Sequence, residues 1–76
     1  MRIEIAEKGV GGRDEHWWYL VFDEIKGDFS IEYEWDYAGW GKSDRGTEAL
    51  SLSEAKEQWP DKYKKAVELI TRKLFN

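Results

Sequence analysis

The segment Phe29 to Tyr37 alternates almost perfectly between apolar and polar side chains, and this pattern constrains the fold more than any other feature of the sequence. In an extended chain successive side chains point to opposite faces, so the aromatic and aliphatic residues share one face and the acidic residues share the other. The alternation therefore predicts a β-strand over residues 29-37 with one buried face.

The preceding segment 17-25, WWYLVFDEI, is the most apolar stretch of the chain and predicts a second, central strand. A two-residue turn at Gly27-Asp28, with glycine in the first central position, would join the two strands in a hairpin. This register places Phe22 opposite Tyr33. It also pairs Leu20 with Trp35, Trp18 with Tyr37, Tyr19 with Asp36, Val21 with Glu34 and Asp23 with Glu32.

The rest of the sequence before the helical region predicts one further strand, two glycine-containing loops and a segment with two interpretations. Residues 2-7 alternate and indicate a short strand, and residues 8-16 and 38-46 read as loops. Residues 47-52 fit either a fourth strand or the approach to a helix, because Ser51 and Glu54 have the spacing of a capping box.

The C-terminal sequence is typical of helix. A short helical turn is expected at about 53-58 and a break near Trp59, because Pro60 disfavours a helical residue before it and suits a first helical position. The main helix is expected over residues 60-75 with an apolar stripe. That stripe consists of Tyr63, Val67, Ile70 and Leu74.

These elements predict an α+β domain spanning residues 1-76. It has two layers: a three- or four-stranded antiparallel meander sheet, and a C-terminal α-helix packed on one face. The expected core comprises Leu20, Phe22, Tyr33, Trp35, Val67 and Ile70.

Composition argues against an enzyme and against metal or cofactor binding. The chain has no cysteine and one histidine, so thiol chemistry, disulfides and histidine pairs are excluded. His16 is expected in a surface loop, and Gly41-Lys42-Ser43 lacks the earlier glycine of a phosphate-binding loop. With no secretory signal and no apolar run of about 18 residues, the sequence indicates a cytoplasmic protein without a membrane segment.

The candidate site is the sheet face that the helix would leave open. Glu32, Glu34 and Asp36 share this face with Trp17 and Tyr19, and a purely solvated face has no need of such aromatic side chains. These five residues, together with Trp40 between two glycines, are the predicted partner-binding residues.

Charge suggests the nature of the partner. Residues 1–52 contain 12 acids and 6 bases, whereas residues 53–76 contain 4 acids and 6 bases. We therefore expect a small acidic protein-binding module that contacts a basic protein surface and inhibits by occupying a nucleic-acid-binding site. The alternatives are a nucleic-acid-binding domain that uses the helix lysines and a homodimerising structural domain.

In size, acidity and an aromatic sheet with one helix, the chain resembles the small inhibitor proteins of bacteria and their viruses, such as anti-CRISPR and toxin-immunity proteins. The resemblance implies inhibition through protein binding. It carries no motif, so no site residue follows from it.

Overall fold

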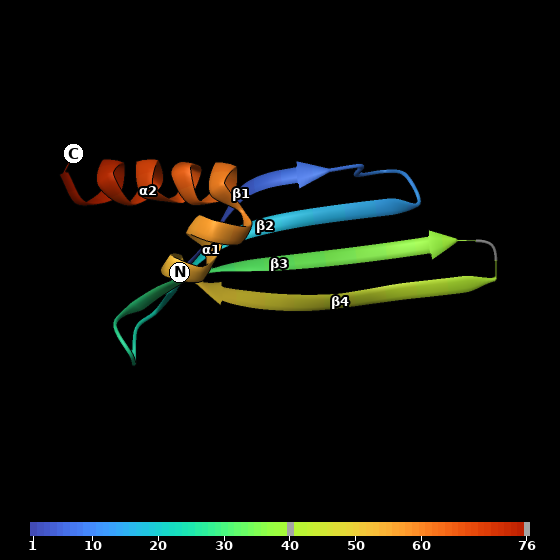
Figure 1. Cartoon of the computed structure of the whole chain (residues 1–76), viewed down its shortest axis with the longest axis horizontal. Helices are drawn as coiled ribbons and strands as arrows, with labels where there is room; N and C mark the ends of the chain where they lie inside the picture. Colours follow the sequence, from blue (N-terminus) through green and yellow to red (C-terminus); the bar gives the residue numbers. More distant parts are fainter. Residues whose placement is uncertain (40, 76) are drawn as a thin grey trace.

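The chain folds into a four-stranded sheet followed by two helices (Figure 1). The computed structural model describes residues 1–39 and 41–75. The strands are β1 (Arg2–Lys8), β2 (Asp14–Asp23), β3 (Asp28–Gly39) and β4 (Lys42–Ser51), and the helices are α1 (Leu52–Gln58) and α2 (Pro60–Phe75).

The sheet is an antiparallel meander in the order β1-β2-β3-β4, which confirms the predicted α+β class. Residues 47-51 belong to the fourth strand, and Ser51 also caps the following helix, so the two expectations for this segment both hold. Both helices pack on one face of the sheet, over the end that contains the N-terminus and the β2–β3 turn (Figure 1).

The predicted register of the β2–β3 hairpin is wrong by four residues. Phe22 pairs with Phe29 rather than with Tyr33, and Asp23 pairs with Asp28 rather than with Glu32. The cause is the Asp23 carboxylate, which accepts hydrogen bonds from the amides of residues 25 and 26 at 2.9 and 3.1 Å and so builds a four-residue turn. Because the shift is an even number, every side chain keeps its predicted face. The other observed pairs are Leu20 with Ile31, Trp18 with Tyr33, Tyr19 with Glu32 and Val21 with Ser30.

The two expected long loops are shorter than predicted. β2 begins at Asp14, β3 continues to Gly39 and β4 begins at Lys42, so the sheet extends well beyond the helices. The polar composition of residues 42–47 suits an edge strand, where charged side chains discourage pairing with other chains. Gly46 has a further role, because a Cβ atom there would lie 2.5 Å from the Trp35 ring.

The start of α1 and the junction between α1 and α2 lie where the sequence predicts them. Ser51 Oγ accepts a hydrogen bond from the Glu54 amide, and the Glu54 carboxylate accepts one from the Ser51 amide, which completes the capping box. These hydrogen bonds lower the pKa of Glu54 below its usual value. Trp59 ends α1 and Pro60 begins α2, at the predicted break.

The core is smaller and more aliphatic than expected. Leu20 and Ile31 are fully buried, whereas Phe22, Tyr33, Trp35 and Ile70 are only partly buried. The prediction for Val67 is wrong, because this side chain is 38% exposed and the neighbouring Ala66 is buried instead. The buried residues are Ile5, Trp18, Leu20, Ile31, Leu50, Ala55 and Ala66.

Candidate functional site

The helices cover only part of the sheet, and the strands project past them toward the β1–β2 and β3–β4 connections (Figure 1). The projecting half therefore exposes side chains on both faces. On the helix side it carries a group of aromatic rings, and the opposite face of the whole sheet carries most of the acidic strand residues.

The face opposite the helices is strongly acidic, and we call it the acidic face. The strand register places eight carboxylates and two arginines on it, around two aromatic side chains in β2. Its charged and aromatic residues are Arg2, Glu4 and Glu7 from β1, Glu15, Trp17, Tyr19 and Asp23 from β2, Asp28, Glu32, Glu34 and Asp36 from β3, and Arg45 from β4.

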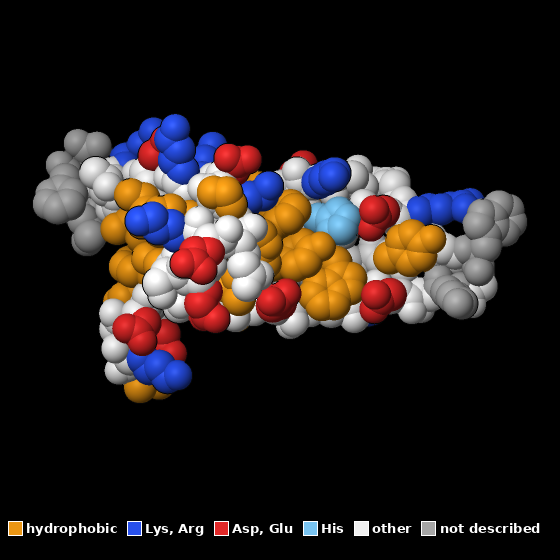
Figure 2. Space-filling model, viewed as in Figure 1, with side chains coloured by type: hydrophobic (Ala, Val, Ile, Leu, Met, Phe, Trp, Pro, Cys, Tyr) orange, Lys and Arg blue, Asp and Glu red, His pale blue; other side chains and the backbone are white. Residues whose placement is uncertain are grey.

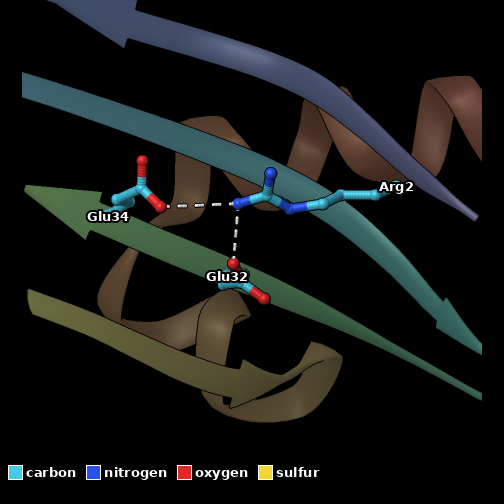
Figure 3. Close-up of polar contacts among 3 residues, drawn as sticks. All are labelled: Arg2, Glu32 and Glu34. Carbon is cyan, nitrogen blue, oxygen red and sulfur yellow. Dashed lines mark hydrogen bonds and ion pairs between the residues drawn. The ribbon is translucent and has the colours of Figure 1, made fainter.

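Arg2 organises one part of the acidic face (Figure 3). Its guanidinium lies 2.8 Å from the Glu32 carboxylate and 3.6 Å from the Glu34 carboxylate, and its central carbon lies 3.6 Å above the Tyr19 ring. The hydrogen bond to Glu32 raises the pKa of Arg2, and burial raises the pKa of Tyr19 although Arg2 acts in the opposite direction. Two of the predicted acidic residues are therefore partly neutralised within the chain.

Beside this cluster the acidic face is hollowed. A cavity of about 300 Å³ lies next to Trp17 and is bordered by residues of β3 and β4. Asp36 and Glu34 line one side, and Arg45 lines the side toward the edge strand. The complete lining is Trp17, Glu34, Trp35, Asp36, Arg45, Gly46 and Thr47.

The helix side of the sheet carries a continuous group of packed rings centred on Tyr33, which we call the aromatic stack: Trp18 is stacked on Tyr33, Trp35 is tilted against it and Trp59 meets it edge-on. The Tyr33 ring centroid lies 4.9 Å from that of Trp18, 5.4 Å from that of Trp35 and 5.6 Å from that of Trp59. Figure 2 shows hydrophobic side chains gathered beside the pale-blue histidine on this face. The stack links the projecting half of the sheet to the junction between α1 and α2.

His16 belongs to this stack rather than to a surface loop, which corrects the prediction for this residue. Its Nε2 lies 2.9 Å from Asp14 Oδ1 and its Nδ1 lies 2.6 Å from the Tyr33 hydroxyl. A carboxylate only accepts hydrogen bonds, so in the neutral ring Nε2 donates to Asp14 and Nδ1 accepts from Tyr33. Burial, together with the charges of Asp14 and Glu48, raises the pKa of Tyr33 above its usual value.

A second cavity of about 260 Å³ lies at the opposite end of the helix side, between the sheet and α2. Its walls are apolar apart from one lysine at the rim. The lining residues are Met1, Leu20, Phe22, Phe29, Leu69, Ile70 and Lys73.

The structure places five of the six predicted site residues on the acidic face, and Trp40 lies outside the described residues. The predicted neighbours within the site are wrong because of the register shift: Tyr19 lies opposite Glu32 and Trp17 lies opposite Glu34. Sequence reasoning missed the contribution of Arg2 and Arg45. The alternation of residues 2-7 places Arg2 on the polar side of its strand. Its contact with β3, however, requires the side chain to reach across β2, which the alternation does not indicate.

No known protein family, curated protein or solved structure matches this chain. Over residues 1–39 and 41–75, no group of three carboxylate or imidazole side chains comes together in a way that could hold a metal ion. Among the same described residues, neither helix is long and apolar enough to cross a membrane.

Proposed function

We propose that this protein is a small, non-enzymatic binding module that docks its acidic face on a basic surface of a partner protein. The observation that supports the proposal is the concentration of carboxylates around Trp17 and Tyr19 on the sheet face opposite both helices. Tyrosine and tryptophan are favoured anchors at interfaces, and complementary charge speeds association.

The proposed consequence is inhibition by competition. Basic protein surfaces commonly hold nucleic acid, whose phosphates supply regularly spaced negative charge. A sheet face with rows of carboxylates offers the same sign of charge at a spacing of about 6.6–6.8 Å along each strand. A partner covered in this way would lose access to its nucleic acid.

The test compares two triple variants that each remove three negative charges from a chain of net charge −4. One variant changes Glu4→Gln, Glu7→Gln and Asp36→Asn on the acidic face. The matched control changes Glu24→Gln, Glu57→Gln and Glu68→Gln, which lie in the β2–β3 turn and on the helices. Crosslinking to wild-type protein in host lysate supplies the partner, and binding is then measured with purified components.

We expect the acidic-face variant to bind about tenfold more weakly, because three surface charge contacts of ~0.5 kcal/mol each add to about 1.5 kcal/mol, and each 1.4 kcal/mol is a factor of about ten in affinity. The control should bind like the wild type, and wild-type affinity should fall as salt rises. Equal binding by both variants would contradict the proposal. Binding of nucleic acid that is lost on changing Lys62, Lys65 and Arg72 would favour the nucleic-acid alternative instead.

A further inference from the structure

The acidic face already contains one bound guanidinium, that of its own Arg2. Three groups hold it: the Tyr19 ring at 3.6 Å, the Glu32 carboxylate at 2.8 Å and the Glu34 carboxylate at 3.6 Å (Figure 3). Tyr19 and Glu32 are direct cross-strand partners, and Glu34 lies two residues further along β3. An aromatic ring on β2 and two successive carboxylates on β3 therefore form a guanidinium site in this fold.

The same arrangement recurs one step along the strands. Trp17 lies two residues before Tyr19 on β2, and its direct partner on β3 is Glu34, with Asp36 two residues beyond. Moving the first site by two residues along both strands thus gives a second ring and a second pair of carboxylates. Glu34 is shared, and Figure 3 shows one of its oxygens directed toward Arg2 and the other directed away.

The second arrangement has room for a ligand. The cavity of about 300 Å³ on this face is lined by Trp17, Glu34 and Asp36, so the ring and both carboxylates border the same space. Arg45 lies directly opposite Asp36 on β4 and is exposed. Within the described residues, Asp36 makes no ion pair with Arg45 or with another base.

We propose that Trp17, Glu34 and Asp36 form a slot for an arginine side chain of the basic partner, an inference that rests on the function proposed above. A guanidinium is planar and weakly hydrated, so it stacks on an indole and donates to two carboxylates together, whereas an ammonium is a compact, strongly hydrated charge. Arg45, directly opposite Asp36, carries a positive charge beside the slot and repels a cationic ligand.

The test uses a blocked Gly-Arg-Gly tripeptide, its lysine counterpart and its isosteric, uncharged citrulline counterpart. Each is titrated into the full chain, and the Trp17 indole N–H resonance is followed by NMR after assignment with Trp17→Phe. The arginine peptide should shift this resonance with a Kd on the order of 1 mM, as suits a single side chain. The lysine peptide should bind more weakly, and the citrulline peptide should leave the resonance unchanged.

Variants sharpen the test because they act in opposite directions. Asp36→Asn should weaken arginine binding by about threefold or more, and Arg45→Gln should strengthen it by about threefold, as expected for the loss of one exposed charge contact. Glu57→Gln, on α1 and away from the acidic face, is the control that should change nothing. In Arg2→Gln, the same peptide should also shift the Tyr19 ring resonances, because the first site is released.

An equal response to the arginine and citrulline peptides, or the same affinity in Asp36→Asn and Glu57→Gln, would overturn the slot. Equal binding of the lysine peptide would overturn the choice of arginine. These outcomes are separate from those of the proposed function. If the arginine peptide does not bind, the comparison of the two triple variants still tests whether the acidic face binds the partner. If the two triple variants bind the partner equally but the arginine peptide still binds, only the proposed partner surface is rejected.

Discussion

Replacing Ile31 by alanine is expected to leave the chain largely unfolded at 25 °C. Ile31 is fully buried in β3, where it pairs with Leu20 on one side and Leu50 on the other. Removing a buried isoleucine side chain costs about 2–5 kcal/mol, and a core of this size supplies only ~3–5 kcal/mol in total. Urea denaturation followed by circular dichroism measures the decrease in the free energy of unfolding.

The matched control is Val67→Ala. The helical pattern predicts Val67 as a core residue, whereas the structure leaves it 38% exposed on α2. Its replacement should therefore change the free energy of unfolding by no more than about 0.5 kcal/mol, as for most surface substitutions. Comparable losses at the two positions would mean that α2 packs through a different face from the one described.

Replacing Tyr33 by alanine should have the second-largest effect on stability, at about 3 kcal/mol. Its ring contacts those of Trp18, Trp35, His16 and Trp59, so it joins the projecting half of the sheet to the helix junction. The near-ultraviolet circular dichroism of the stacked indoles should weaken together with the loss of stability.

Tyr33→Phe separates the ring from the hydroxyl. The phenylalanine keeps the ring contacts but loses the hydrogen bond to His16 Nδ1. We therefore expect the free energy of unfolding to fall by about 1 kcal/mol. If Tyr33→Ala and Tyr33→Phe lower the free energy of unfolding equally, the hydroxyl rather than the ring holds this cluster together. The stabilising role assigned to the aromatic stack would then be wrong.

The alternating pattern predicted the faces of β2 and β3 correctly even though the register was wrong. Side-chain direction repeats every two residues, so any even shift preserves the faces, and the pattern carries no information that distinguishes such shifts. The deciding group was the Asp23 carboxylate, which binds two amides of the turn. That interaction depends on local geometry and not on hydrophobicity.

Two other differences have similarly local causes. β4 lies at the sheet edge, where polar residues are normal, so residues 42–46 lack the alternation that signals a half-buried strand. On α2, hydrophobicity favours Val67 over Ala66, but the smaller side chain is the buried one. A small residue permits close approach of the helix to the sheet. The periodicity of hydrophobic residues does not indicate where such a close approach occurs.

For the candidate site, the sequence predicted which strand residues share a face but not how they interact. Trp17, Tyr19, Glu32, Glu34 and Asp36 lie on that face as expected. The salt bridges from Arg2 cross an intervening strand, and no pattern in the sequence indicates such a contact. The hollow beside Trp17 also depends on the course of β4, which was expected to be a loop there.

Side-chain footprinting of the purified complex with the captured partner, read by mass spectrometry, identifies the surface that the partner covers. If the partner covers the acidic face, Trp17 and Tyr19 should be protected from labelling, while Tyr37, which is 44% exposed on the helix side, should be labelled as in the free protein. Protection of Tyr37 and Trp35 with unchanged labelling of Trp17 would place the partner on the aromatic stack and rule out the acidic face as the binding surface.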